Sequence, residues 1–223
     1  MDYFEFIQIN AERLIDGTII TILQFFTSSI VAITIAFVTG LLLLSRITVL
    51  RFTTICYVEI FRGTSLLVQL FWFFYALPVF GISLDKFTAG FLAIGLNVGA
   101  YGAHVVKSAI MSVPKGQWEA CIALNLTPSQ RMIRIILPQA IIIMLPIWGN
   151  LLIELLKATA LVALISVADL MFETRMINNM TFQSVQAFGT ALVVYYILAR
   201  FCVTPVMTAV ERVMGKRIGR AKI

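Results

Sequence analysis

Few side chains in this 223-residue chain could carry out covalent or metal chemistry. The one histidine is His104, and the three cysteines, Cys56, Cys121 and Cys202, are far apart in the sequence. They form neither a Cys-x-x-Cys pair nor a set of zinc ligands. The acidic residues are scattered, so acid–base or metal-assisted catalysis has no cluster to perform it. We therefore predict that the chain is not an enzyme and has no catalytic residue, no metal site and no cofactor.

Nucleotide hydrolysis also lacks its usual motif. A Walker A loop needs Gly-x4-Gly-Lys-Ser/Thr to wrap backbone donors around phosphate, and the sequence contains no such run. Any ATP hydrolysis that serves this chain is predicted to belong to another polypeptide.

Polar side chains at helical spacing could instead bind a small solute. One set consists of Asn97, Tyr101, His104 and Ser108. It lies roughly opposite a stripe of small residues suited to close helix packing, which consists of Gly95, Gly99 and Ala103. A second set consists of Asn150, Glu154 and Lys157. If the two sets face each other they line a route, and the alternative is hydrogen bonding or ion pairing between helices.

A third polar feature interrupts an apolar segment. Glu59 and Arg62 are three residues apart, so they can pair on one helix face. Gly63-Thr64 follows and loosens the backbone, which predicts a kink. We take the charged pair as structural and Thr64 as a residue that lines the path.

A polar, helix-capable hairpin at 113–134 lies in the sequence between the polar set that ends at Ser108 and the polar set that begins at Asn150. It contains Glu119-Ala120-Cys121-x3-Asn125 and leads into Ile135-x-Leu137-Pro138. A membrane chain without chemistry of its own can use such a hairpin to receive mechanical work from a soluble partner. The plainer alternative is a surface helix that only anchors a connection.

The elements that position these residues are membrane helices. The chain is 60% hydrophobic and 13% charged, with a mean hydropathy of +0.96, so lipid is its expected solvent. Uncharged runs reach about 18 residues, the length that crosses hydrocarbon. They predict an all-α, polytopic membrane protein of one domain, with helices at about 18–44, 53–78, 87–111, 135–156 and 185–210. We also expect a bend at Pro146, and a short interfacial helix at 166–175 that ends in a turn at Asn178-Asn179.

The orientation follows from the basic residues, which stay cytoplasmic. One side carries Arg46, Arg51, Lys115, Arg131, Arg134, Arg212, Lys216, Arg217, Arg220 and Lys222. The other side carries Arg13, Lys86, Lys157 and Arg175. The N-terminus is thus predicted outside and the C-terminus in the cytoplasm. The net charge of +6 reflects this bias and not nucleic-acid binding.

The hairpin resembles the loop of ATP-binding-cassette (ABC) importer permeases whose usual form is Glu-Ala-Ala-x3-Gly-x9-Ile-x-Leu-Pro. Three further stretches resemble the polar-amino-acid branch of that family. Glu59 to Gln69 is similar to Glu-x-Phe-Arg-Gly-Thr-Pro-Leu-Leu-Val-Gln, and Asn97-x-Gly99-Ala100-Tyr101 to Asn-Ser-Gly-Ala-Tyr. Val113-Pro114-Lys115-Gly116-Gln117 leads into the hairpin as in that branch. Together these stretches cover most of the chain from Tyr57 onward.

The resemblance implies the five-helix transmembrane domain of a type I ABC importer in a bacterial cytoplasmic (inner) membrane. It implies three kinds of partner: a second permease, identical or homologous, an ABC ATPase dimer, and an extracytoplasmic solute-binding protein. The residues that would couple to the ATPase are Glu119, Ala120, Cys121, Asn125 and Pro138. The residues that would line the substrate pathway are Thr64, Asn97, Tyr101, His104, Asn150 and Glu154. ATP binding and hydrolysis would drive alternating access.

Departures from the branch bear on the turn and on the solute. Asn125 replaces a glycine, and Asn is the next best residue for a left-handed backbone. His104 stands where Glu is frequent, and the segment from Lys157 to Leu161 lacks an acid found there, which argues against a cationic amino acid. The segment from Glu154 to Leu161 resembles permeases for ectoine and hydroxyectoine. We therefore favour a compact zwitterion of that kind over an ordinary polar amino acid.

Two alternatives remain from the sequence. The chain could be a permease for a charged amino acid, or an ion-coupled secondary carrier that works alone. Such carriers usually have internal repeats and discontinuous helices in one long chain, and no repeat is evident here.

Overall fold

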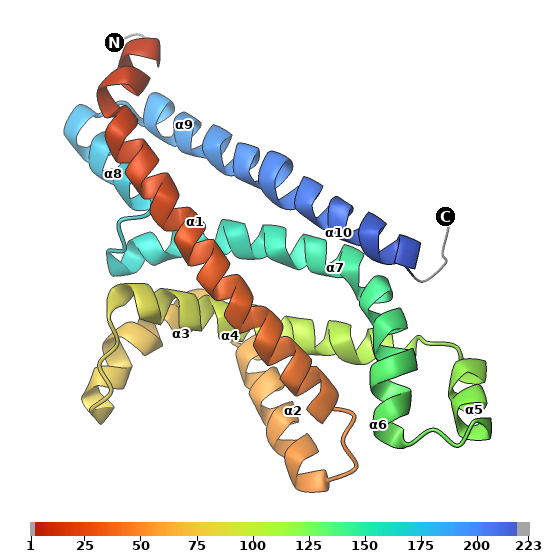
Figure 1. The fold of residues 1–223 in the computed structure, drawn as a ribbon. Coiled ribbons are helices and arrows are strands. Elements are labelled where there is room, and N and C mark those ends of the chain that lie inside the picture. The colour runs from red at the N-terminus through yellow and green to blue at the C-terminus, as the bar shows by residue number, and fades with distance from the viewer. Residues whose placement is uncertain (1–2, 218–223) are drawn as a thin grey trace.

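The computed structural model describes residues 3–217, which form α, 3-10 and π helices and no strand within that range. Among these residues, four helices are long and apolar enough to cross a membrane, and a fifth span results if a bent helix pair is counted as one. Figure 1 shows the N-terminus and α8 (Leu170–Thr181) at one end of the bundle. The helices α5 (Lys115–Ala123) and α6 (Pro128–Arg131) lie at the other end, toward the C-terminus. The basic tail residues Arg220 and Lys222 lie outside the described residues.

The helix α4 (Lys86–Met111) forms the centre of the bundle, and α1 (Tyr3–Leu42) crosses it. A Cβ added at Gly95 would lie 2.7 Å from the Val31 side chain, and one at Gly99 would lie 3.0 Å from Ile35. Only glycine permits this approach of the two backbones. The predicted packing role of the small-residue stripe is therefore confirmed for these two glycines.

The second span is two helices and not the single helix expected over 53–78. The first part, α2 (Thr48–Gly63), meets the second at an angle of 105°. The second part comprises α3 (Leu66–Phe71), η1 (Trp72–Ala76) and η2 (Leu77–Phe80). Thr64 and Ser65 between them are extended, so the break falls at the predicted kink.

Three π-helical segments precede prolines. The segments are η1, η3 (Met132–Ile136) and η5 (Leu198–Val203), and the prolines are Pro78, Pro138 and Pro205. In each case the residue before the proline donates its N–H to the carbonyl five residues back, as Leu137 does to Met132. Proline has no N–H and its ring clashes with the carbonyl four residues back, so a widened turn lets the helix continue.

The fourth span changes direction within α7 (Leu137–Ala158). Figure 1 shows α6 and the start of α7 running in one direction and the rest of α7 in another. Pro146 is the proline inside this helix, so the change of direction agrees with the bend expected there.

The end of the bundle near the N-terminus is built from η4 (Thr159–Ile165), α8 and the start of α9 (Ser184–Ile197). The short helix expected at 166–175 begins later, because Asp169 is its N-cap and accepts from the Phe172 N–H at 2.9 Å. Asn178 and Asn179 lie inside α8, and the chain reverses at Phe182, whose φ is 56°. The turn predicted at the two asparagines is thus wrong.

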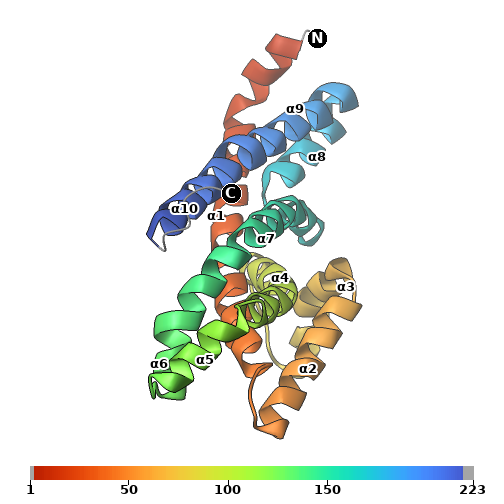
Figure 2. The same ribbon diagram turned by 90° about the vertical axis from the view of Figure 1, so that its right-hand side faces the viewer.

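Figure 2 shows α4 and α7 in the middle of the molecule, with α2 and α3 on one side. The last span, α9 with η5 and α10 (Thr204–Arg217), lies on the other side. The two sets of polar residues identified from the sequence therefore lie on the two central helices. The set from Asn97 to Ser108 is on α4, and the set from Asn150 to Lys157 is on α7.

Candidate functional site

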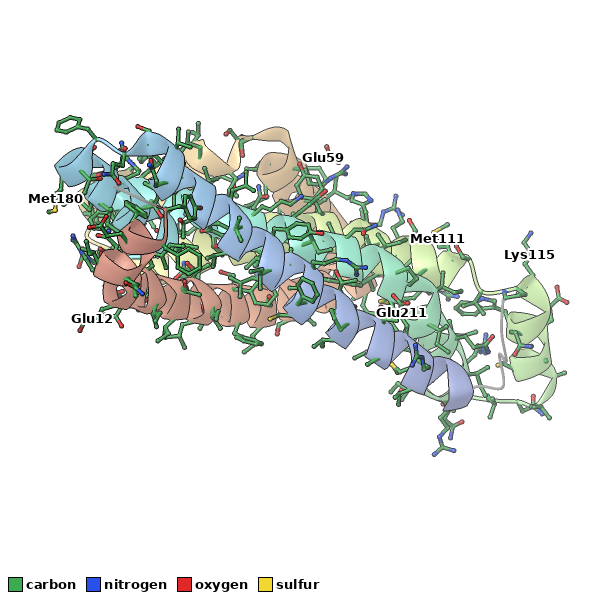
Figure 3. The ribbon with its side chains drawn as sticks, turned by 90° about the horizontal axis from the view of Figure 1, so that it is seen from above. Glu12, Glu59, Met111, Lys115, Met180 and Glu211 are labelled. Atoms are coloured by element: carbon green, nitrogen blue, oxygen red, sulfur yellow. The ribbon has the colours of Figure 1, made fainter. Side chains whose placement is uncertain are left out.

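The helix α5 projects from the end of the bundle. Figure 3 shows Lys115, at its first residue, well beyond Met111, the last residue of α4. Glu119 and Ala120 are exposed, whereas Cys121 is only 2% exposed. Glu119 makes no hydrogen bond or ion pair with any side chain that the structure describes, or with the backbone of residues 3–217. One face of α5 thus packs inward, and the other presents a free carboxylate beside a small residue.

The turn after α5 depends on Asn125. Its φ of 51° is left-handed, as expected from its place in the motif. The Leu126 N–H donates to the Cys121 carbonyl at 3.1 Å, and the Asn125 N–H donates to the Ile122 carbonyl at 2.9 Å. This pair of bonds is a Schellman motif, which satisfies the last carbonyls of a helix. Asn125 therefore fixes where α5 ends and in which direction the chain leaves it.

The chain then enters the fourth span through a capping box. The Thr127 hydroxyl accepts from the Gln130 N–H at 3.3 Å, and the Gln130 side chain accepts from the Thr127 N–H at 3.1 Å. Pro138, at the start of α7, follows the π-helical turn. Beside it, the Gln139 amide donates to the Gln117 side chain at 3.2 Å, which joins α7 to α5.

Side chains from three helices make a core beneath α5. Trp118 packs against a cluster that includes Val113 at the end of α4 and Ile136 before α7. The same cluster extends along the bundle to Met144 and Trp148. Because packed cores transmit displacement with little loss, a movement of α5 would be carried into α4 and α7 together.

A second group of polar side chains surrounds the break between α2 and α3. Asn97 on α4 is 7% exposed and donates to the Phe61 carbonyl at 2.9 Å and to the Gln69 side chain at 3.1 Å. Gln69 donates in turn to the Phe61 carbonyl at 2.9 Å and to the Thr64 hydroxyl at 2.6 Å. A broken helix frees carbonyls that must find other donors. Asn97 and Gln69 supply those donors and thereby hold the break against α4.

Tyr101 lies one turn further along α4 and is 40% exposed. Its hydroxyl donates to the Arg62 carbonyl at 3.4 Å, and the Arg62 guanidinium lies 5.3 Å from the centre of its ring. The distance is within the range of a cation–π contact. Within the described residues Arg62 forms no ion pair with Glu59, so the predicted pair is wrong: Arg62 contacts Tyr101 on α4 instead.

The remaining predicted pathway residues are not joined to this group. His104 is half-buried on α4, and Asn150 and Glu154 are exposed on α7. None of them makes a hydrogen bond or ion pair in the part of the chain that the structure describes, and Glu154 is not paired with Lys157 there. The structure thus brings Thr64, Asn97 and Tyr101 together and leaves the other three as separate polar positions.

Two residues of this region were missed from the sequence. Gln69 bridges Thr64 and Asn97, and the Tyr57 hydroxyl donates to the Leu96 carbonyl on α4 at 2.6 Å. The sequence did contain a signal for Gln69, because it is a glutamine inside an otherwise apolar run and buried amides in membrane helices need partners.

Comparison with known proteins agrees with this architecture. Residues 32–216 match the family model described as "Binding-protein-dependent transport system inner membrane component". A probable amino-acid ABC transporter permease of Sinorhizobium fredii, y4tF, is 42% identical over 82% of this chain and 80% of its own length. The L-cystine transport system permease TcyB of Bacillus subtilis is 36% identical over 90% of this chain and 84% of its own.

Solved structures extend the agreement to three dimensions. A chain of a crystal structure of an amino acid ABC transporter with histidines has a TM-score of 0.87 and 30% identity, covering 95% of this chain and 98% of that one. A chain of the inward-facing MetNI methionine ABC transporter has a TM-score of 0.75 over 90% of this chain and 95% of its own. At 22% identity the second likeness concerns the fold alone.

The chain belongs to the family of inner membrane components of binding-protein-dependent transport systems. It is a multi-pass membrane permease with the type I ABC importer fold. It is a transport subunit and not an enzyme, and ATP hydrolysis resides on a separate subunit.

Proposed function

We propose that this permease imports a small zwitterionic solute by alternating access, driven by an ABC ATPase dimer that engages α5. The observation that carries the proposal is the construction of α5. An exposed helix with a free Glu119 is joined through one packed core to the two central spans, α4 and α7. Nucleotide-driven closure of the ATPase would move α5 as a rigid body, and the packed core would convert that movement into a change in the tilt of α4 and α7.

The coupling residues have separable tasks in this proposal. Glu119 offers its carboxylate to the ATPase, and Ala120 leaves room for close contact because both are exposed on α5. Cys121 holds the opposite face to the bundle, Asn125 ends the helix, and Pro138 marks the turn through which α7 receives the motion.

The solute pathway runs past the break in the second span and along α4 and α7. Thr64, Asn97 and Tyr101 line it at the break, and His104, Asn150 and Glu154 line it elsewhere. The Asn97 amide donates to the Phe61 carbonyl and to the Gln69 side chain. These two bonds also support the alternative that the role of Asn97 is structural. Tyr101 and Glu154 are exposed, so they are the more accessible to a solute.

A second permease, identical or homologous, completes the pathway. Glu59, Arg62 and Glu154 lie on spans or on the bent pair and are exposed in the single chain. Charged groups exposed at membrane depth are costly in lipid, so they favour a partner or an aqueous cavity. Figure 3 shows Glu59 at the edge of the bundle, where such a partner would contact it.

The N-terminus is proposed to lie outside and the C-terminus in the cytoplasm. The N-terminus and α8 share one end of the bundle, and α5 shares the other with the basic Arg131 and Arg134. Basic residues near membrane ends resist translocation, so the α5 end is the cytoplasmic one. The solute-binding protein would then deliver its ligand at the end that carries α8.

The solute is either a polar amino acid or a compact zwitterion such as ectoine or hydroxyectoine. Relatives named for amino acids and for L-cystine support the first. The resemblance of residues 154–161 to ectoine permeases supports the second. Competition assays with labelled ectoine, glutamine and arginine would separate them, and arginine is expected to compete least.

Energy coupling is tested in proteoliposomes that contain the permease with its co-expressed ATPase, supplied with the binding protein. Uptake is expected to require ATP inside and to persist when ion gradients are collapsed. Uptake that continues without ATP and stops with the gradient would identify an ion-coupled carrier instead.

A further inference from the structure

The turn between α1 and α2 contains a basic depression that the transport function does not use. It has a volume of about 220 Å³ and is lined by Arg46, Thr48, Arg51, Phe52 and Ile55. Because it lies where α1 ends at Leu42 and α2 begins at Thr48, it is at a membrane surface whichever way the chain is oriented.

The two arginines carry charge that no described residue neutralises. Arg46 and Arg51 are exposed, and neither side chain makes an ion pair or a hydrogen bond among residues 3–214, whose side chains the structure describes. No acidic residue lines the depression. Two guanidinium groups beside one hollow form a site for an anion, and their planar donor forks suit the oxygens of a phosphate.

The backbone at the start of α2 adds to this field. Ile47 is the N-cap and provides no side-chain acceptor, so the first N–H groups of this 16-residue helix have no acceptor within it. The positive end of the helix dipole therefore adds to the charge of the arginines. The Thr48 hydroxyl lies in the same lining and can donate to an anion.

The rest of the lining is apolar and distinguishes a lipid from a free ion. Phe52, next to Arg51, is 65% exposed, and Ile55, about one turn further along α2, is 38% exposed. A soluble phosphate would gain nothing from these side chains, whereas a lipid would place its chains on them.

We propose that Arg46 and Arg51 bind the phosphate of an anionic phospholipid, with Phe52 and Ile55 contacting its acyl chains. The ligand is a membrane-embedded phosphodiester with net negative charge. The site would fix the turn between α1 and α2 to the bilayer surface while α5 moves with the ATPase.

The test uses the full-length permease, purified in non-ionic detergent and stripped of lipid, with native mass spectrometry to count bound dioctanoyl phosphatidylglycerol. The double variant Arg46→Gln with Arg51→Gln is compared with the wild type. Each arginine at a membrane surface contributes about a fivefold gain in affinity for an anionic lipid. The double variant is therefore expected to bind about 30-fold more weakly, and each single variant about fivefold.

Two variants control for charge and for folding. Arg212→Gln removes another exposed arginine, on α10, that does not line the depression, and it is expected to bind phosphatidylglycerol as the wild type does. Arg46→Lys with Arg51→Lys keeps both charges and is expected to retain most of the affinity. Dioctanoyl phosphatidylcholine has no net charge. Its affinity for the wild type should be no higher than its affinity for the double glutamine variant.

Three results would overturn the proposal. The first is equal phosphatidylglycerol binding by the wild type and the double glutamine variant. The second is displacement of phosphatidylglycerol by an equal concentration of inorganic phosphate, which would make this a site for the free ion. The third is unchanged lipid binding together with loss of the co-purified ATPase, which would make the two arginines a protein contact.

Discussion

The Asn97 amide donates to the Phe61 carbonyl at 2.9 Å, and this bond joins the central helix α4 to the break in the second span. The same amide donates to the Gln69 side chain. Asn97 thus satisfies the Phe61 carbonyl and also positions Gln69, which donates to that carbonyl as well. The break is therefore held by side chains from α4 and α3, through Asn97 and Gln69.

Replacing Asn97 by Ala is expected to destabilise the protein by about 1–3 kcal/mol, because it removes two hydrogen bonds and leaves the Gln69 side-chain oxygen without its donor. Asn150→Ala is the matched control, since Asn150 is exposed and makes no hydrogen bond in the described chain. Thermal unfolding of both purified variants checks the difference. If Asn97→Ala unfolds at the wild-type temperature, the amide is not what holds the break.

Changes on the exposed face of α5 are expected to uncouple transport. Glu119→Gln removes the free charge, and Ala120→Trp adds bulk at the proposed contact with the ATPase. Both positions are exposed, so membrane insertion and thermal stability should stay as in the wild type. ATP-dependent uptake should fall at least tenfold, a loss of about 1.4 kcal/mol in coupling.

Lys115→Gln serves as the control for α5, because it changes a charge at the exposed first residue of the same helix. It is expected to keep most of the uptake. Wild-type uptake by both the Glu119 and Ala120 variants would argue that α5 does not contact the ATPase.

Asn125→Gly is expected to stabilise the turn after α5, and Asn125→Ala to weaken it by about 1 kcal/mol. The reason is the φ of 51°, which costs a residue with a Cβ about 1–2 kcal/mol while glycine adopts it freely. Hydrogen exchange of the Leu126 amide, which donates to Cys121, reports on the motif directly. Exchange of this amide should be about fivefold faster in Asn125→Ala than in the wild type. Identical exchange rates in Asn125→Ala and Asn125→Gly would count against the role of Asn125.

Gly95→Ala is expected to destabilise the contact of α1 with α4 by about 1–3 kcal/mol, the usual cost of overpacking. The added Cβ would lie 2.7 Å from the Val31 side chain and 3.1 Å from the Ser28 carbonyl, and backbone atoms cannot move aside as a flexible side chain can. Gly116→Ala is the control, because a Cβ there meets nothing within 4 Å. Equal melting temperatures for the two variants would contradict the close packing.

Much of this architecture follows from the sequence, and the reasons for the failures are specific. Gly95 and Gly99 were identified as packing residues because helical spacing alone places small residues on one face. The partners of Asn97 were not foreseen, since the Phe61 carbonyl is free only because the helix breaks three residues later. Glu59 and Arg62 both lie in the regular helix α2, but Arg62 contacts Tyr101 on α4 instead of Glu59. Spacing predicts contacts within a helix, whereas these contacts arise between segments.

Asp169 should make stability depend on pH. Burial raises the pKa of this carboxyl to about 6, although the Phe172 N–H and the Tyr195 hydroxyl donate to it. Between about pH 4 and pH 6 the folded protein therefore binds more protons at this site than the unfolded chain, and stability falls as the pH rises. Above that range the loss is constant, at about 3 kcal/mol.

Asp169→Asn removes the titration and keeps an oxygen that can accept from the Phe172 N–H. Its melting temperature relative to the wild type is therefore expected to rise between pH 4 and pH 7. Asp85→Asn is the control, because hydrogen bonds from Thr88 lower the pKa of that exposed carboxyl and most of its titration lies below pH 4. The difference in melting temperature between Asp85→Asn and the wild type should therefore stay nearly constant between pH 4 and pH 7. A constant difference between wild type and Asp169→Asn across this range would show that Asp169 does not titrate there, and that its bonds to Phe172 and Tyr195 outweigh its burial.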